Sequence, residues 1–319
     1  MAPTTPVVLE PYCQAVLDNL PEFDITQIPP ELTRAAEGKV PVDVPEVLEE
    51  RKSIPSRDGS KSISLTITRP VGSENKVLPV IIYLHGGGWV LGSELNYKPV
   101  RYELTVRANA VVIFVNYSLS PEVRHPVALE ECYDTLEWIA KNGASINVDT
   151  SKLVVAGDSA GGNLTTVLSM LDKKRGLNAI KYQVLYYPVT DANFSTGSYN
   201  QFQEGYYLTR KMMEWFWNQY VPEEKDRRDI TAAPLHASDE DLKGLPPAFV
   251  MTAEADVLRD EGEAYARKLV AAGVQVTAVR VLGLIHGVFN VGNLSPLTSW
   301  VVDQTVETLQ KFWGTRANL

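Results

Sequence analysis

Short runs of apolar residues alternate with longer segments of helical period along most of the chain. From Val80 onward these runs are continuously apolar, as in strands buried on both faces of a parallel sheet. Two earlier runs alternate polar and apolar residues, which is typical of an exposed sheet edge. The pattern predicts strands over Ile54–Arg57, Ile63–Thr68, Val80–Leu84, Val111–Asn116, Leu153–Ala156, Gln183–Tyr187, Ala248–Thr252 and Val276–Val281.

The segments between the strands have apolar residues at helical spacing and polar residues elsewhere around the turn. Leu129, Cys132, Leu136 and Ile139 share one face of such a helix. Similar patterns predict helices over Gly162–Asp172, Glu261–Ala272 and Ser299–Trp313. Strands that alternate with helices indicate an α/β fold, with a doubly wound, mostly parallel sheet of eight strands flanked by helices.

Two segments, residues 1–50 and 191–235, interrupt this alternation. The first is helical and punctuated by proline, and the second contains an aromatic helix over Thr209–Val221. We expect both to form a helical cap over the carboxyl ends of the strands, where ligands bind in such folds. Residues 51–190 and 236–319 would then form the catalytic domain. The expected pocket side chains from the insertion are Tyr206, Tyr207, Trp215, Phe216 and Trp217.

The composition is that of an ordinary globular protein: 319 residues, 45% hydrophobic and 22% charged. The formal net charge of −9 disfavours binding to nucleic acid or to a membrane surface. No apolar run approaches the ~20 residues of a membrane-spanning helix, and the N-terminus lacks the pattern of a signal peptide. We therefore expect a cytoplasmic protein. Its oligomeric state stays open, a homodimer included.

Two cysteines, Cys13 and Cys132, are too few for a disulfide framework or a zinc cluster. Both lie on apolar helix faces, so we expect two buried free thiols. No cluster of metal ligands stands out in the sequence. We expect neither a metal nor an organic cofactor.

The sequence Gly157-Asp158-Ser159-Ala160-Gly161 lies between a predicted strand and a predicted helix. A Gly-x-Ser-x-Gly pattern alone is weak, but this context is the one in which a nucleophilic serine stands on a sharp turn. The glycines allow the turn, and the residue after the serine opens a helix whose free N–H groups favour negative charge. We expect Ser159 to be a nucleophile.

A second glycine-rich motif, His85-Gly86-Gly87-Gly88-Trp89, follows the predicted strand Val80–Leu84. Three consecutive glycines cost conformational entropy and suit a place where the backbone approaches a ligand closely. The N–H groups of Gly87 and Gly88, with that of Ala160, would hold an oxyanion. His85 and Gly86 would support the loop, and we expect His85 to order it rather than to act as a base.

A serine nucleophile needs a base, and the chain has four histidines. His85 belongs to the glycine loop, and His125 and His236 lie in proline-rich loops. His286 follows the last predicted strand, near the C-terminus, where an imidazole can reach the nucleophile of an earlier strand. We therefore expect His286 to be the base.

The acid that orients this base is expected just after the strand Ala248–Thr252. Asp256 is the leading candidate, and Glu254 and Asp260 compete with it. Asp260 also has the position of an N-cap for the next helix, which favours Asp256. The order Ser159, Asp256, His286 is that of hydrolase-fold enzymes.

With these motifs the chain resembles the hormone-sensitive-lipase family of α/β-hydrolase esterases. The segments that carry the resemblance are His85-Gly-Gly-Gly-Trp89, Asn116-Tyr-Ser-Leu-Ser-Pro-Glu122, Gly157-Asp-Ser-Ala-Gly161, Leu245-Pro-Pro247, Asp256-Val-Leu-Arg-Asp260 and His286-Gly287. The resemblance covers about residues 50–315 and departs at Val257, where the family usually has proline. It implies an α/β-hydrolase fold with Ser159, His286 and Asp256 as catalytic residues, and Gly87, Gly88 and Ala160 as the oxyanion hole.

The expected activity is hydrolysis of short- to medium-chain neutral carboxylic esters through an acyl-enzyme. A lactonase, an amide hydrolase or a biosynthetic acyl transferase would use the same residues, so these alternatives stay open. Receptors on this fold resemble the family but lack the catalytic histidine. The presence of His286 therefore argues against a receptor.

Overall fold

The central element of the protein is one eight-stranded sheet with the strand order β1-β2-β4-β3-β5-β6-β7-β8. The computed structural model describes residues 7–20, 24–38 and 42–315. β2 pairs antiparallel with both of its neighbours, and every other pair is parallel. The strands are β1 (Val47–Pro55), β2 (Ser62–Pro70), β3 (Leu78–Leu84), β4 (Val111–Asn116), β5 (Val148–Asp158), β6 (Tyr182–Tyr186), β7 (Ala248–Ala255) and β8 (Val276–Ile285).

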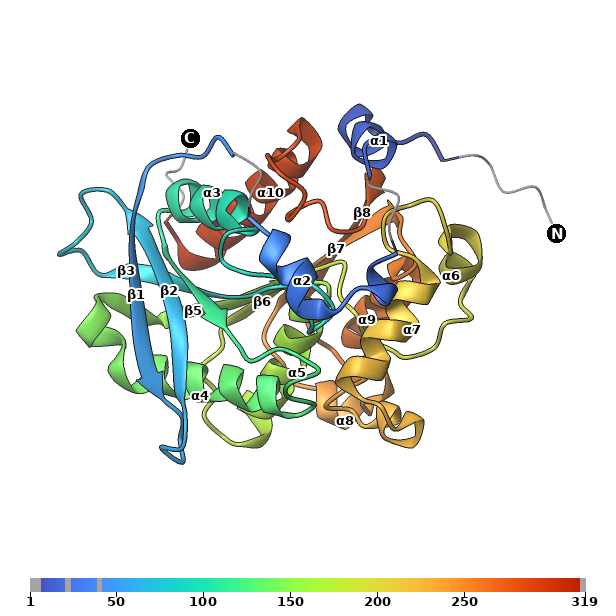
Figure 1. Cartoon of the computed structure of the whole chain (residues 1–319). Coiled ribbons are helices and arrows are strands. Elements are labelled where there is room, and N and C mark those ends of the chain that lie inside the picture. The colour runs from blue at the N-terminus through green and yellow to red at the C-terminus, as the bar shows by residue number, and fades with distance from the viewer. Residues whose placement is uncertain (1–6, 21–23, 39–41, 316–319) are drawn as a thin grey trace.

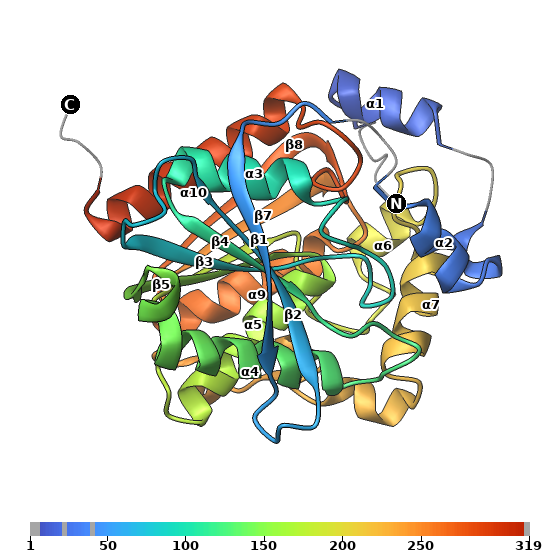
Figure 2. The same cartoon turned by 60° about the vertical axis from the view of Figure 1, so that its left-hand side comes forward.

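Helices cover both faces of this sheet, as Figures 1 and 2 show. α3 (Lys98–Ala108) and α10 (Pro296–Trp313) pack together on one face. The other face carries α4 (Val127–Asn142), α5 (Ala160–Lys174) and α9 (Arg259–Ala271). The short elements are η2 (Gly143–Ile146), η3 (Glu224–Arg228), η4 (Pro234–His236) and α8 (Asp239–Leu242). The expected α/β sheet, mostly parallel and flanked by helices, is confirmed.

Two edge strands differ from the prediction. β1 begins at Val47, before the predicted strand and inside the segment predicted as cap. The sequence pattern does not indicate this start, because the exposed charged residues of β1 hide the alternation of a strand. Charged residues on an edge strand prevent pairing with other chains. β8 is the opposite edge, and its first five residues are partly or largely exposed rather than buried on both faces. It extends to Ile285, so that His286 follows the strand directly.

Two helices also differ from the prediction. α3 has no predicted counterpart, because its charged residues obscure the apolar pattern of the helix. One of these residues, Arg101, is buried and forms an ion pair with Glu49 at 3.0 Å. α9 begins at Arg259 with Leu258 at the N-cap. Asp260 therefore lies in the first turn, and its predicted role as N-cap is wrong.

The N-terminal segment and the insertion after β6 lie side by side at one end of the sheet (Figures 1 and 2). The N-terminal helices are α1 (Pro11–Asp18), η1 (Ile25–Gln27) and α2 (Pro30–Ala36), and those of the insertion are α6 (Gly197–Phe202) and α7 (Arg210–Tyr220). An ion pair between Asp24 and Lys211 joins the two segments. α1 contacts β8, where the Glu10 N–H donates to Gly283 O at 2.9 Å. This end is the one at which the parallel strands deliver the motif residues.

Candidate active site

Ser159 stands on the turn between β5 and α5 with φ of +55°, a region that few residues other than glycine adopt. Its neighbours must be small. A Cβ on Gly157 would lie 2.3 Å from Gly161 O, and one on Gly161 would lie 1.9 Å from Leu84 O. The two glycines therefore let β5, the turn and α5 approach β3, and the strained turn raises the serine side chain above the sheet.

A continuous hydrogen-bond chain links three of the predicted residues. The Ser159 Oγ lies 2.8 Å from His286 Nε2, and His286 Nδ1 lies 2.8 Å from Asp256 Oδ2. The other carboxylate oxygen of Asp256 accepts the Leu258 N–H at 2.9 Å, which fixes the acid in place. All three side chains are buried, with 6% of Ser159, 5% of His286 and 1% of Asp256 exposed. This is the geometry of a nucleophile, a base and an orienting acid.

The two competing acids are engaged elsewhere. Glu254 Oε2 accepts the Gly283 N–H at 2.8 Å. Asp260 accepts the Ser198 N–H at 2.8 Å and pairs with Arg259 at 2.9 Å. Of the three candidates, the structure brings only Asp256 to His286, because β7 runs to Ala255 and delivers the next residue to the site.

The remaining histidines do not reach the nucleophile. His85 is buried, its Nδ1 lies 2.7 Å from Gly86 O, and its ring stacks on Tyr117 with centroids 4.2 Å apart. Burial lowers the pKa of His85 to about 4, so the ring is neutral. His125 Nε2 lies 3.1 Å from Thr231 O, and His236 pairs with Asp191. The contacts of His85 support its predicted role in ordering the glycine loop.

The glycine loop turns through left-handed conformations, with φ of +99° at Gly87 and +61° at Gly88. A Cβ on Gly88 would lie 2.1 Å from Phe216 Cδ1, so the α7 side chain covers the loop closely. Among the described residues, no hydrogen bond uses the N–H of Gly87 or Gly88. Ala160 opens α5, where a backbone N–H has no partner within the helix. These three N–H groups are therefore available to bind negative charge.

Asp158 connects the serine turn to the glycine loop. Its Oδ1 accepts the Tyr83 hydroxyl at 3.1 Å and the Gly86 N–H at 3.0 Å, and its Oδ2 accepts the Tyr97 hydroxyl at 3.0 Å. Asn290 donates to the same Tyr97 hydroxyl at 3.3 Å. Burial raises the pKa of Asp158 to about 6, while its donors and the nearby His286 oppose this shift. The tyrosines and Asn290 have no motif of their own, and only the rule that buried hydroxyls need partners points to them.

A cavity of about 780 Å³ opens above Ser159 and His286. Two of the predicted pocket residues, Tyr207 and Phe216, line it. Tyr206, Trp215 and Trp217 do not line it, which corrects that part of the prediction. Tyr206 packs on Phe202, Trp215 packs on Phe216, and Trp217 is fully buried against Trp89. Successive helix residues point about 100° apart, and at this turn of α7 Phe216 faces the cavity while Trp217 faces the interior.

Further lining residues come from segments with no recognisable motif. α1 and the residues after it contribute Tyr12, Val16 and Leu20, and α7 contributes Met212 and Met213. An apolar face on the first helix is visible in the sequence. Its position over a serine some 140 residues later is not visible there, because it depends on tertiary packing.

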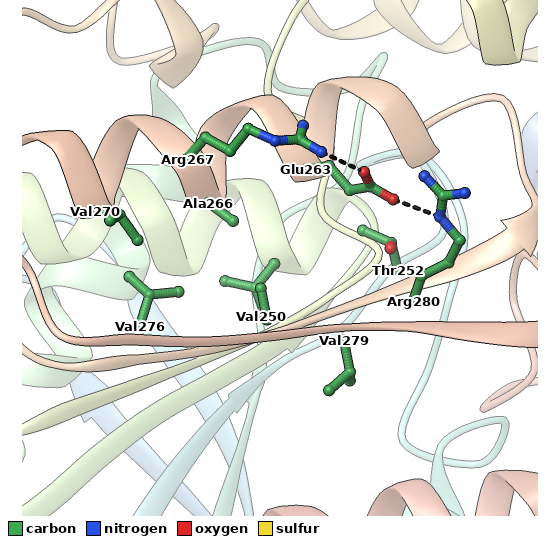
Figure 3. A pocket seen from close by; sticks show the side chains of 10 residues that line it. Val250, Thr252, Glu263, Ala266, Arg267, Val270, Val276, Val279 and Arg280 are labelled. Atoms are coloured by element: carbon green, nitrogen blue, oxygen red, sulfur yellow. Dashed lines mark hydrogen bonds and ion pairs between the residues drawn. The ribbon is translucent and has the colours of Figure 1, made fainter.

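A second cavity, of about 460 Å³, lies between α9 and the edge strand β8 (Figure 3). Its valine side chains meet an ionic cluster in which Glu263 pairs with both Arg267 and Arg280. Both arginines of this cavity are therefore paired with the same carboxylate, and one positive charge is left in excess. None of the predicted site residues lines it.

Other features bear on the class of site. Within the described ranges no group of three or more histidine, cysteine or acidic side chains is arranged to hold a metal ion. Cys13 and Cys132 are both buried free thiols, as expected. No helix in the described part of the chain is long and apolar enough to cross a membrane.

Residues 81–290 match the family described as alpha/beta hydrolase fold. The chain belongs to this family. The α/β hydrolase is 35% identical over 309 residues to the carboxylesterase NlhH of Mycobacterium tuberculosis, covering 95% of this chain and 96% of that one. It is similar to an esterase structure from Rhizomucor miehei, with 58% identity, a TM-score of 0.94 and coverage of 97% and 98%.

A thermostable esterase from Pseudomonas putida also has a similar structure, with 42% identity, a TM-score of 0.91 and coverage of 97% of this chain and 98% of that one. The matched region contains the glycine loop, the serine turn, Asp256 and His286. The expected resemblance to the hormone-sensitive-lipase type of α/β hydrolase is therefore confirmed.

Proposed function

We propose that this α/β hydrolase is a serine carboxylesterase that hydrolyses short- to medium-chain neutral esters through an acyl-enzyme. The observation that carries the proposal is the hydrogen-bond chain from Asp256 through His286 to Ser159, beside a cavity large enough for a small ester. Relatives whose names describe them as carboxylesterase and ethyl acetate hydrolase support the same reaction class.

In the first half of the proposed reaction, His286 Nε2 takes the proton of the Ser159 hydroxyl while Oγ attacks the ester carbonyl carbon. The negative charge that develops on the carbonyl oxygen is stabilised by the N–H groups of Gly87, Gly88 and Ala160. His286 then gives its proton to the departing alkoxide, and the C–O bond to the alcohol breaks. Asp256 stabilises the transient imidazolium and holds the ring orientation.

In the second half, water takes the place of the alcohol. His286 accepts a proton from the water as its oxygen attacks the acyl carbon, and the same N–H groups bind the second oxyanion. The bond to Ser159 Oγ breaks, the serine recovers its proton from His286, and a carboxylic acid leaves. Every proton is returned, and the steps use the three side chains, the three backbone N–H groups and water.

The cavity supports a preference for small, apolar acyl groups. Met212, Met213 and Phe216 of α7 and Val16 of α1 line it, and apolar walls favour substrate methylenes by about 0.8 kcal/mol each. Its finite volume ends this gain when the acyl chain fills it, because further atoms must displace packed side chains. The net charge of −9 also disfavours anionic esters.

The test is to measure kcat/KM over p-nitrophenyl esters from acetate to palmitate, beside a matched amide and a lactone. We expect the esters with short and medium acyl chains to be hydrolysed fastest, and Ser159→Ala to abolish the activity. Faster turnover of the lactone or the amide would overturn the assignment to carboxylic esters. Activity that survives in the Ser159→Ala variant would overturn the acyl-enzyme.

A further inference from the structure

The cavity above Ser159 has an uneven distribution of charge. Its described lining contains the acidic residues Glu37 and Asp158 and the imidazole of His286, and no described residue that lines it is lysine or arginine. Asp158 and His286 are occupied by the contacts of the site described above. Glu37, which follows α2, is therefore a negative charge in the cavity that the proposed reaction does not use.

Glu37 is held beside the glycine loop. Its Oε1 accepts the Gly92 N–H at 2.8 Å, and Gly92 lies so close to the loop that a Cβ there would be 2.5 Å from His85 Nδ1. Burial raises the pKa of Glu37, although the Gly92 N–H, Ser93 and the charge of Arg34 oppose this shift. Burial therefore disfavours the ionised form of Glu37, and a positive charge bound nearby would stabilise that form.

Arg34, whose charge acts on Glu37, is committed to other partners. Its guanidinium donates to Val90 O at 2.7 Å, to Ser120 O at 2.6 Å and to the Glu122 carboxylate at 2.8 Å. The charge of Arg34 is therefore already paired with Glu122, which lies outside the cavity lining.

Tyr207 faces the same space. Tyr207 is the central residue of a γ-turn, in which the Leu208 N–H donates to Tyr206 O at 3.0 Å. Its φ is +71°, and γ-turns with a positive φ are strained. Burial and, to a lesser extent, the charge of Glu37 raise the pKa of Tyr207 to about 12, so the phenol lies within electrostatic reach of the carboxylate. The Tyr207 hydroxyl donates no hydrogen bond to any described residue. A strained turn thus directs an aromatic ring with a free hydroxyl into the cavity.

The position of Tyr207 also indicates which half of an ester lies beside it. A Cβ on Gly287 would lie 2.7 Å from Tyr207 Cε1, so the ring packs beside the residue that follows His286. The leaving alcohol must lie at His286 Nε2, since it receives its proton there. Tyr207 therefore faces the alcohol half of a bound ester, and Glu37 and the ring of Tyr12 line the same cavity.

We propose that Glu37 and Tyr207 make this cavity selective for esters whose alcohol carries a positive charge, of the quaternary ammonium class. A carboxylate and aromatic faces together are the groups that bind such cations. The proposal rests on the proposed ester hydrolysis and adds to it a preference on the alcohol side. It does not depend on which acyl group the enzyme favours.

The test compares butyrylcholine with 3,3-dimethylbutyl butyrate, which has the same shape and acyl group but a neutral carbon in place of the quaternary nitrogen. We expect kcat/KM to be about tenfold higher for butyrylcholine, a ratio worth about 1.4 kcal/mol. Glu37→Gln keeps an oxygen for the Gly92 N–H and removes the charge. It should lower the ratio about tenfold.

The matched control is Glu31→Gln, which removes an exposed charge from the same α2 helix, outside the cavity lining. This variant should keep the wild-type ratio. Tyr207→Leu should lower the ratio by removing the aromatic face. Equal loss of both substrates in Glu37→Gln would mean that Glu37 only holds the glycine loop, and a wild-type ratio at or below one would also overturn the proposal. If neither ester is hydrolysed by the wild-type enzyme, the proposed function itself fails.

Discussion

The Asp158 carboxylate accepts the Gly86 N–H at 3.0 Å and so joins the residue before the proposed nucleophile to the start of the glycine loop. A Cβ on Gly86 would lie 2.6 Å from Asp158 Oδ2, which leaves no room for a side chain at that position. The nucleophile and the proposed oxyanion-binding N–H groups are therefore held in register by one buried carboxylate.

Replacing this carboxylate should weaken stabilisation of the transition state more than it weakens substrate binding. Asp158→Asn keeps one oxygen acceptor but presents an amide N–H₂ to the Tyr97 hydroxyl, which already accepts from Asn290. We expect kcat to fall roughly tenfold to a hundredfold with little change in KM, because misplaced oxyanion donors act mainly in the transition state. Steady-state kinetics on a soluble butyrate ester measures both constants. A variant with unchanged kcat and a raised KM would contradict this role.

The same substitution should change how stability depends on pH. The pKa of Asp158 is about 6 in the folded protein against an ordinary value of 3.8, so the folded state binds this proton more tightly than the unfolded chain. The contribution of Asp158 to the free energy of unfolding should therefore decrease as the pH rises from about 4 to about 6. Urea denaturation at several pH values checks this. The difference between wild type and Asp158→Asn isolates this group from other acids, and a difference that is flat across the window would refute the assignment.

Ser159→Ala should abolish ester hydrolysis and leave the fold intact. The turn depends on Gly157 and Gly161, whose places a Cβ would obstruct, and among the described residues the serine hydroxyl bonds only to His286. A fluorophosphonate probe followed by peptide mapping identifies the nucleophile, and circular dichroism checks the fold. We expect modification of Ser159 alone. Modification of a different serine would remove Ser159 from the proposed mechanism.

Asp256→Asn should lower kcat by roughly 10²–10⁴, because the amide cannot stabilise the imidazolium or fix the tautomer of His286. Glu254→Gln and Asp260→Asn are matched controls, since their carboxylates bind Gly283 N–H and Ser198 N–H rather than the base. Both should retain most of kcat, and Asp260→Asn should lose some stability with the Arg259 pair. A larger loss of kcat in Glu254→Gln than in Asp256→Asn would show that the orienting acid is misassigned.

The sheet and the three candidate catalytic residues, Ser159, Asp256 and His286, could be predicted because their signals in the sequence are local. A buried strand is a continuous apolar run. Each motif consists of residues at fixed spacing, at positions where the backbone conformation or a close contact permits only a few residue types. Ser159 needs Gly157 and Gly161 beside it, and the glycine loop is three residues that tolerate no Cβ. The parallel strands then bring these separate motifs to one edge of the sheet.

The cavity walls could not be predicted in the same way. Whether Phe216 or Trp217 faces the substrate depends on how α7 rotates against Trp89, and neither side chain reveals that rotation. Glu37 reaches the glycine loop only because α2 packs near Gly92, through a contact between residues 55 positions apart. The start of edge strand β1 could not be predicted for a different reason, since the charged residues that protect this edge hide its strand pattern.

The size of the acyl group that the enzyme accepts should depend on Phe216. Its ring lies against Gly88 and lines the cavity, so Phe216→Ala enlarges the space beside the proposed oxyanion donors. In the wild type we expect kcat/KM to rise over the first acyl carbons and then to collapse for long chains. In Phe216→Ala the maximum should move to longer acyl chains, because methylenes that overpacked the cavity now find space. The measurement is kcat/KM over p-nitrophenyl esters from acetate to palmitate.

Trp217→Ala is the control for this prediction, since Trp217 belongs to the same helix and is fully buried but does not line the cavity. Removing its ring should cost about 3–5 kcal/mol of stability, whereas the position of the maximum along the ester series should stay where it is in the wild type. Thermal denaturation of both variants separates the two effects. If Trp217→Ala shifts the preferred chain length and Phe216→Ala does not, the wall of the acyl site is on the other side of α7. The preference would then be set by the Trp89 contact rather than by the ring over Gly88.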